Sequence, residues 1–449
     1  MRDMFSLRQL WKLEGSVSRR VYAVAGVLGF ALKYLIDFSI ARFFHASWSP
    51  WSYWRLIRLN ENHPRITAEM FLALLIASVP FLWFGMVMTL LRLRDAGHSA
   101  GWAALFFVPV LNVVLFATLC VLPSRPTQHG RDLSGLLESS LFAVVLTLAV
   151  TTLAIALATR VLATYGIGLF VAVPFSVGYL SAFILRRRYG SKAKPYLVAT
   201  VSLLLLGGLL LALAWEGIVC LAMAFPLAFV AALLGAYCGS RARTDTSVPP
   251  PPTPAYLVAA LLPLAIIGEV ALRPTPPIYC VETSVLVNAP IERVWQNVIS
   301  FPPITARPEW YFRAGISYPL RARIVGTGVG ATRLCEFTTG TFVEPITVWN
   351  QPRLLRFSVV SNPAPLTELS PRGTIDAPHL HGFLVSSAGQ FVLKPLGNGR
   401  TLLVGTTWYK HSLWPANYWR LWSDTIIHRI HLRVLRHIKG LSETPSSTG

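Results

Sequence analysis

The sequence predicts a multi-pass α-helical membrane region followed by one water-soluble α+β domain. Three observations lead to this fold class. About eight long apolar stretches fill roughly the first 275 residues and then stop. The composition agrees, because 53% of the 449 residues are hydrophobic, only 13% are charged and the mean hydropathy is +0.53. From Val281 onward, alternating strand patterns and a final amphipathic helix replace the apolar runs.

The apolar stretches are the candidate membrane spans, because a spanning helix needs about 20 mostly apolar residues. The first stretch also holds Lys33 and Asp37, which lie four residues apart and can pair on one helix face. Gly235 and Gly239 have a spacing that favours close helix packing. No cleavage site follows the basic N-terminal segment, so we expect the first span to remain as an anchor. The candidate spans are 21–40, 67–91, 102–122, 140–163, 166–185, 196–215, 217–238 and 255–273.

The net charge of +20 suits loops that lie against anionic lipid headgroups. The basic residues form no single dense patch, which argues against nucleic-acid binding. The basic N-terminus favours a cytoplasmic start, and eight spans would return the C-terminal domain to the cytoplasm. The basic run 186–194 would then lie outside, against the positive-inside rule. We expect a cytoplasmic domain, but one miscounted span would place it across the membrane.

The five cysteines are scattered and form no CxxC pair, so the sequence predicts neither disulfides nor a metal site, and no cofactor. His379 and His381 would place two imidazoles on one face of an extended segment. Such spacing can bind a metal ion, but no carboxylate or cysteine accompanies it in the local sequence.

A loop between two spans carries the clearest motif of the membrane region. Glu14-Gly15-Ser16 and Arg19-Arg20 precede a span, and the sequence 92–102 follows the next one. This pattern resembles a bacterial inner-membrane family, the domain of unknown function 805. This chain has Arg94 where that family usually has histidine, and Ala100 interrupts its Ser-Gly pair. The motif positions carried over are Arg92, Arg94, Asp95, His98, Ser99 and Trp102.

The resemblance implies an inner-membrane location for residues 1–125 and no specific activity. In physical terms, Arg92, Arg94 and Asp95 at a span end can pair with each other or with lipid phosphate, and Trp102 suits the interface. We interpret the loop as an interfacial anchor, with a headgroup or ligand site as the alternative.

The C-terminal region has a second recognisable pattern. A strand at 281–288 runs through Ala289-Pro290 into a short helix with Trp295, and a glycine-rich turn follows at 326–331. Gly397-Asn398-Gly399 predicts a hairpin turn between strands 389–396 and 401–409. A long amphipathic helix is expected at 415–441.

This order resembles the START-like, polyketide cyclase/dehydrase (SRPBCC) superfamily. The resemblance implies a helix-grip fold, in which a curved sheet wraps the long helix around a deep cavity for hydrophobic molecules. We place this domain at 276–443. Residues 126–275 form further transmembrane helices with a proline-rich linker at 247–254, and a disordered tail occupies 444–449.

Aromatic and polar side chains of this domain are the candidate cavity residues. His379 and Glu336 are further polar groups that can point inward, whereas His428, His431 and His437 lie among arginines and are expected on an outward basic surface. The cavity candidates are Trp310, Tyr311, Arg333, Trp349, His381, Gln390, Trp408, His411, Trp414, Tyr418 and Trp422.

Three functions fit these observations. We favour a tethered domain that binds a hydrophobic ligand such as a lipid or isoprenoid, as a carrier or sensor. A cyclase or dehydratase is the first alternative, and it requires at least two of the polar candidates to converge in one pocket. A transporter regulated by the soluble domain is the second, and it requires ionisable residues such as Arg160, Glu216 and Glu269 to meet within the membrane. The oligomeric state is not determined by the sequence.

Overall fold

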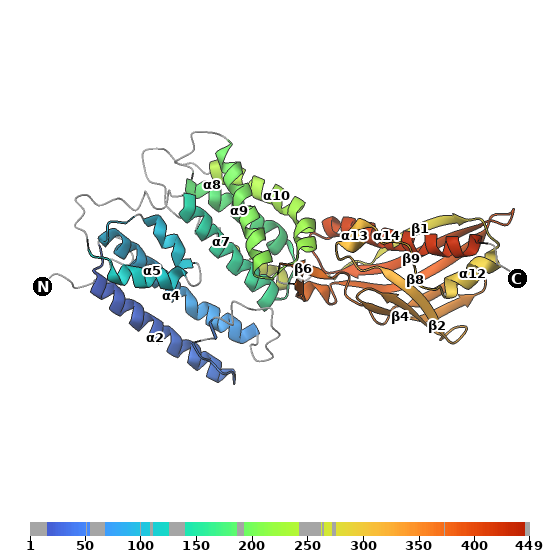
Figure 1. The fold of residues 1–449 in the computed structure, drawn as a ribbon, viewed down its shortest axis with the longest axis horizontal. Helices are drawn as coiled ribbons and strands as arrows, with labels where there is room; N and C mark the ends of the chain where they lie inside the picture. Colours follow the sequence, from blue (N-terminus) through green and yellow to red (C-terminus); the bar gives the residue numbers. More distant parts are fainter. Residues whose placement is uncertain are drawn as a thin grey trace. The chain divides into compact units, whose positions relative to one another are not determined.

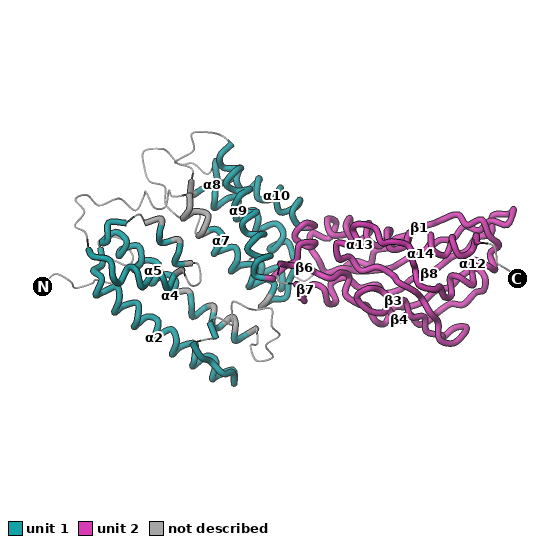
Figure 2. The backbone as a smooth tube through the Cα atoms, viewed as in Figure 1, with its two compact units in different colours: residues 1–213, 224–271 teal, residues 214–223, 272–449 magenta. Residues whose placement is uncertain are grey.

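The computed structural model divides the chain into two compact units (Figure 2). The first unit is Met1–Leu213 with Ala224–Ala271, and the second is Ala214–Met223 with Leu272–Gly449. The described residues are 16–50, 52–53, 68–98, 100–107, 111–124, 140–185, 193–241, 262, 265–271, 275–371 and 373–444.

The first unit is helical (Figure 1). The apolar side chains that predict membrane spans also fill its interior, where α2, α4 and α5 share one buried cluster. The helices are α2 (Arg19–Phe43), α4 (Ala68–Asp95), η1 (Ala100–Phe107), α5 (Leu111–Val121), α7 (Ser140–Ala156), η2 (Leu157–Val161), η3 (Gly168–Ala172), α8 (Val173–Leu185), α9 (Lys194–Ala212) and α10 (Ile218–Arg241), whose first residues belong to the second unit.

Four helices within the described ranges are long and apolar enough to cross a membrane: Arg19–Phe43, Ile76–Asp95, Lys194–Ala212 and Ile218–Arg241. Three shorter apolar helices cover Asn112–Val121, Thr147–Thr159 and Gly168–Phe183. Eight full spans are therefore not shown. The candidate at 102–122 is divided between η1 and α5. The linker at 247–254 and most of the candidate span at 255–273 lie outside the described residues.

Glycines allow two helices of the first unit to approach backbone to backbone. A Cβ added to Gly235 would lie 2.0 Å from the carbonyl oxygen of Phe175, and one added to Gly239 would lie 2.4 Å from that of Tyr179. Contacts this short are sterically forbidden, so α8 and α10 pack this closely because both positions are glycine. The packing role predicted for this pair is confirmed, within one chain.

The second unit is built on a seven-stranded antiparallel sheet with the order β1-β9-β8-β5-β4-β3-β2 (Figure 1). Its strands are β1 (Tyr279–Val287), β2 (Pro319–Val325), β3 (Thr332–Phe337), β4 (Gly340–Asn350), β5 (Leu354–Ser358), β8 (Leu384–Pro395) and β9 (Thr401–His411). A separate two-stranded sheet pairs β6 (Glu368–Ser370) with β7 (Gly373–Ile375). Short helical segments α12 (Ile291–Ile299), α13 (Trp310–Arg313) and η5 (Pro378–Leu380) connect the strands.

The long helix α14 (Ala416–Glu443) packs against this sheet. Val434, Leu435 and Ile438 join the main core with side chains of the strands and of α12, while Ile427 packs with Val281 of β1 and Tyr409 of β9. A curled antiparallel sheet with a C-terminal helix across it resembles the helix-grip fold, so the expected architecture of this unit is borne out.

The local signals explain these elements. Gly397, Asn398 and Gly399 all have positive φ, which is the conformation that this hairpin turn requires between β8 and β9. The alternation of β1 places Val281 and Val287 in the interior. The helix α14 follows Pro415, which occupies its N-cap position.

Candidate functional site

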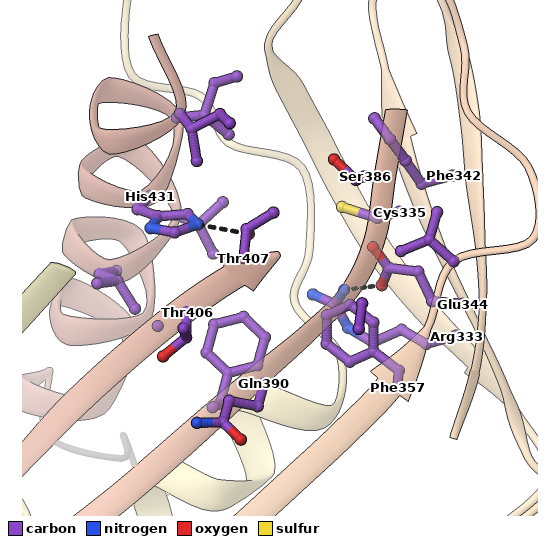
Figure 3. A pocket seen from close by; sticks show the side chains of 18 of the residues that line it. Arg333, Cys335, Phe342, Glu344, Phe357, Ser386, Gln390, Thr406, Thr407 and His431 are labelled. Carbon is purple, nitrogen blue, oxygen red and sulfur yellow. Dashed lines mark hydrogen bonds and ion pairs between the residues drawn. The ribbon is translucent and has the colours of Figure 1, made fainter. Parts of the chain in front are cut away.

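A cavity of about 120 Å³ lies between the sheet and α14 in the second unit (Figure 3). Its walls come from β3, β4, β5, β8, β9 and α14, so distant parts of the sequence converge on it. Most of the lining is apolar: Cys335, Phe337, Phe342, Phe357, Val359, Ala388, Phe391, Gly405, Ile427, Ile430, Val434 and Leu435. The polar lining residues are Arg333, Glu344, Ser386, Gln390, Thr406, Thr407 and His431.

A buried ion pair lines one side of the cavity. Arg333 of β3 and Glu344 of β4 are directly opposite each other in the sheet register, and Nη1 of the arginine donates to the carboxylate. Only 2% of Arg333 is exposed, and its guanidinium lies 5.5 Å from the ring of Phe357 and 5.4 Å from that of Phe391. Burial raises the pKa of Glu344, and the adjacent arginine opposes this shift. The pair therefore places two opposite charges, which largely cancel each other, next to the aromatic side chains of the cavity.

The thiol of Cys335 lies on the same face of β3 as Arg333. Burial raises the pKa of this thiol to about 12. It is therefore protonated at neutral pH and is a poor nucleophile, because the thiolate is the reactive form.

Histidine and threonine side chains line the opposite side. Nε2 of His431 lies 2.8 Å from Oγ1 of Thr407, and its Nδ1 lies 3.1 Å from Oγ1 of Thr283 (Figure 3 shows the first contact). Burial lowers the pKa of His431 to about 4, so the imidazole is neutral at pH 7. The expectation of an outward basic surface is wrong for His431. It occupies the apolar stripe of α14, between Ile427 and Leu435, and so faces the cavity.

One buried polar atom that faces the cavity has no hydrogen-bond partner among the described residues. It is Nε of Arg333. A buried donor without a partner costs about 1–3 kcal/mol. A ligand that supplied an oxygen to this group would recover that cost.

The sequence-based cavity candidates are placed differently from one another. Arg333 and Gln390 line the cavity, and the amide oxygen of Gln390 accepts hydrogen bonds from Arg356. The other nine are not in its lining. Trp349 packs against Trp295, Trp408 lies under the guanidinium of Arg356, and the hydroxyl of Tyr418 donates to the carbonyl of Met223.

The remaining candidates lie at other positions in the second unit. Trp310 is 71% exposed, and Tyr311 stands near the guanidinium of Arg429. His411 is buried between ring contacts to Tyr279 and Tyr409. The remaining three are the exposed His381, with Nε2 lying 2.5 Å from Asp376, and the half-buried Trp414 and Trp422.

The polar groups on which the enzyme alternative depends do not meet in this cavity. These groups are Arg333, Glu336, His379, His381 and His411, and only Arg333 lines the cavity. Glu336 pairs with Arg321 on the outside of the sheet, and His379 lies beside Glu216 and Cys220. For the transporter alternative, the carboxylate of Glu269 accepts hydrogen bonds from the backbone N–H groups of Ile167 and Gly168 at a helix start. The side chain of Arg160 lies outside the described part of the chain.

The loop motif of the first unit connects the ends of α4 and α5 through buried hydrogen bonds. Arg92 is fully buried; Nε donates to the carbonyl of Leu119 over 2.9 Å, Nη2 donates to that of Leu122, and Nη1 pairs with Asp95. The arginine therefore satisfies carbonyl groups at the end of α5. The pairing with Asp95 is confirmed, but the acceptors of Arg92 are backbone carbonyls rather than lipid phosphate.

The same motif also ends α4. Gly97 has a φ of 71°, and the N–H of His98 donates to the carbonyl of Leu93 over 3.0 Å, which is a Schellman closure. Arg94 makes further interactions at this helix end, and Trp102 is exposed, as expected of an interfacial residue. Ser99 lies outside the described residues.

Sequence reasoning missed Glu344, Thr406, Thr407 and His431. One signal was available, because His431 falls on the helical stripe of Ile427, Val434 and Ile438. The others depend on the strand register, which the sequence alone does not reveal.

Comparisons with known proteins add the following. The profile of the family described as "Protein of unknown function (DUF805)" matches residues 10–131. No curated protein matches the chain. A solved structure of truncated norcoclaurine synthase from Thalictrum flavum is 12% identical and covers 38% of this chain and 98% of its own, with a TM-score of 0.26.

Two further solved structures are similar. The ZhuI aromatase/cyclase from Streptomyces sp. R1128 is 17% identical and covers 38% of this chain and 99% of its own, with a TM-score of 0.26. A protein from Nitrosospira multiformis is 18% identical and covers 37% of this chain and 97% of its own, with a TM-score of 0.24. At these TM-scores the likenesses carry nothing about ligand or activity. The four apolar helices and the match over residues 10–131 together identify a membrane protein whose N-terminal region resembles the family of unknown function DUF805.

Proposed function

We propose that the second unit binds a hydrophobic ligand, such as a lipid or isoprenoid, and that the protein acts as a membrane-anchored carrier or sensor. One observation carries the proposal. The cavity between the sheet and α14 is mostly apolar, yet one of its buried polar atoms, Nε of Arg333, has no hydrogen-bond partner among the described residues. An apolar pocket with a few polar groups is the usual form of a small-molecule site.

The size and charge of the cavity narrow the ligand class. A volume of about 120 Å³ is close to the roughly 150 Å³ of an engineered cavity that binds benzene, so it holds a ring or a short branch. A longer chain needs side chains of α14 to move. Because Glu344 already balances the charge of Arg333, the polar end that fits best is a neutral carbonyl or hydroxyl oxygen.

The placement in the bacterial inner membrane, with the second unit in the cytoplasm, belongs to the same proposal. The basic N-terminal segment and the net charge of +20 support it. Anionic lipid headgroups are the expected partners of these basic residues.

A competition assay on the full chain in detergent tests the proposal. The probe is an apolar fluorescent dye, displaced by a panel of isoprenoid alcohols and fatty alcohols. Val359→Phe fills the cavity, whereas Val360→Phe adds the same side chain at the exposed neighbour. We expect Val359→Phe to weaken binding at least about tenfold, which is 1.4 kcal/mol, and Val360→Phe to leave it unchanged. Equal binding by all three proteins would refute this cavity as the site.

A further inference from the structure

Three metal-ligating side chains meet in the second unit, outside the cavity. Glu216 and Cys220 come from the segment that leads into α10 and begins it, and His379 comes from η5. One ligand atom of each lies within 4.8 Å of the others. Because 159 residues separate Cys220 from His379, the fold and not the local sequence brings them together.

The imidazole of His379 lies next to both other side chains, and one of its two nitrogens would ligate an ion. Sγ of Cys220 lies 2.9 Å from Nε2 of His379, and Nδ1 of that imidazole lies 3.6 Å from a carboxylate oxygen of Glu216. His379 is buried. Thiolate, imidazole and carboxylate are the three ligand types that zinc takes in proteins. Hard cations such as Mg²⁺ and Ca²⁺ prefer oxygen ligands alone, so the mixed set favours a transition metal.

A second carboxylate next to the cluster provides an independent observation. Glu368 of β6 is fully buried, and its Oε1 accepts the backbone N–H of Cys220 over 2.9 Å. Its Oε2 has no hydrogen-bond partner among the described residues, and no described lysine or arginine forms an ion pair with Glu368. A buried carboxylate without a nearby positive charge is costly. A divalent cation beside it would supply that charge.

A glycine at the start of α10 allows the carboxylate of Glu368 to approach the backbone there. A Cβ added to Gly217 would lie 1.7 Å from Oε2 of Glu368, so only glycine lets the carboxylate approach the start of α10. Glu368 thereby fixes the backbone position of Cys220, because it holds the N–H of that residue.

We propose that Glu216, Cys220 and His379 form a binding site for Zn²⁺ or a similar divalent transition-metal ion, and that Glu368 positions Cys220. Zinc bonds of about 2.0–2.3 Å bring tetrahedral ligand atoms to less than about 4 Å apart, so these side chains need only small shifts. Three protein ligands leave a fourth position for water or for Glu368. The Cys220 thiol releases its proton on binding, so affinity rises with pH.

Metal titration of the full chain in detergent tests the site. After chelation, zinc is added back and bound zinc is measured by elemental mass spectrometry. Co²⁺ replaces zinc in parallel, and a thiolate-to-cobalt charge-transfer band reports the cysteine ligand. The variants are Cys220→Ser and His379→Gln. Their matched controls are Cys280→Ser, at an exposed cysteine of the same unit, and His381→Gln, two residues beyond His379.

We expect the wild type to bind about one zinc ion per chain and to show the cobalt–thiolate band. Cys220→Ser should lose the band, and His379→Gln should bind zinc at least about tenfold more weakly. Both controls should match the wild type. A wild type that binds no zinc, or controls that lose as much as the variants, would overturn the proposal.

A measurement on the wild type alone does not depend on whether the variants fold. The wild type is treated with a maleimide with and without zinc, and the modified cysteines are identified by mass spectrometry. Zinc should slow modification of Cys220 and leave that of Cys280 unchanged. Equal modification of Cys220 in both conditions contradicts a metal-bound thiolate.

Discussion

Arg92 in the first unit and Arg333 in the second are both buried arginines, but their surroundings differ. All three guanidinium nitrogens of Arg92 donate, to two backbone carbonyls at the end of α5 and to Asp95. Arg333 pairs with Glu344 through Nη1, its Nε has no partner among the described residues, and aromatic rings surround it. Arg92 therefore holds the ends of α4 and α5 together, whereas Arg333 has one donor, Nε, that a ligand can use.

The difference shows how to interpret charge in a largely apolar protein. A buried arginine whose donors all bind acceptors of the protein has a structural role. A buried charge next to a cavity, with a donor left over, indicates a binding site.

Arg92→Leu should cause the largest loss of stability. It removes three hydrogen bonds and leaves the carboxylate of Asp95 with the hydroxyl of Ser124 but without its cation, and breaking a buried pair in this way costs about 3–5 kcal/mol. The midpoint of thermal unfolding in detergent and the yield of monodisperse protein measure it. Arg20→Leu, at an exposed position of α2, is the control and should behave as the wild type. An unchanged midpoint for Arg92→Leu would contradict the structural role.

Arg333→Met should also destabilise, but the double variant Arg333→Met/Glu344→Leu should not. The single change leaves Glu344 buried and unpaired, at a cost of about 3–5 kcal/mol, whereas replacing both partners by apolar residues is often neutral. Urea unfolding followed by tryptophan fluorescence measures each step. In the double variant, a hydroxylated ligand should bind at least about tenfold more weakly, while a pure hydrocarbon binds as before. Equal loss for both ligands would argue that Arg333 is structural, like Arg92.

His431 should make stability depend on pH. Its folded pKa is about 4, against 6.5 for an ordinary histidine, because burial disfavours the charged ring. Between these values the unfolded chain binds more protons, so stability rises with pH over this window and is lost as the pH falls towards 4. The contribution is up to about 3 kcal/mol.

Comparison of urea unfolding at pH 7 and pH 5 measures this dependence. His431→Gln should reduce the difference between the two pH values, and His381→Gln, at an exposed histidine outside the cavity, should preserve it. A wild type with the same unfolding midpoint at both pH values would show that His431 is accessible to water in the folded state.

Arg321→Ala should have the smallest effect. Arg321 pairs with Glu336 over 2.7 Å on the outer face of the sheet, where water screens the charges. Unfolding and ligand binding should both match the wild type within error. A large loss of stability or of ligand binding would show that this exposed ion pair has a structural role.

The sequence predicted those parts of the fold whose signals are local. The Gly397-Asn398-Gly399 turn sets a hairpin by backbone conformation alone, and the terminal helix shows its apolar stripe over many turns. Both are confirmed. Eight full spans are not shown within the described residues, and composition does not reveal where an apolar stretch breaks, as between η1 and α5.

The site was less predictable, because it depends on long-range pairing. Arg333 was selected from sequence, but its partner Glu344 lies across a strand pair whose register the sequence leaves open. His431 was misjudged because its arginine neighbours outweighed its place on the apolar stripe. The ligand set of Cys220 and His379 has no local signal, since the two residues come from separate segments of the chain.

Native mass spectrometry of the full chain, extracted gently from its own membrane, tests whether the cavity holds a ligand. We predict that the wild type retains a defined apolar ligand, that Val359→Phe loses it and that Val360→Phe keeps it. A wild type that carries no ligand and binds none when isoprenoids or fatty alcohols are added would contradict a carrier or sensor role for this cavity.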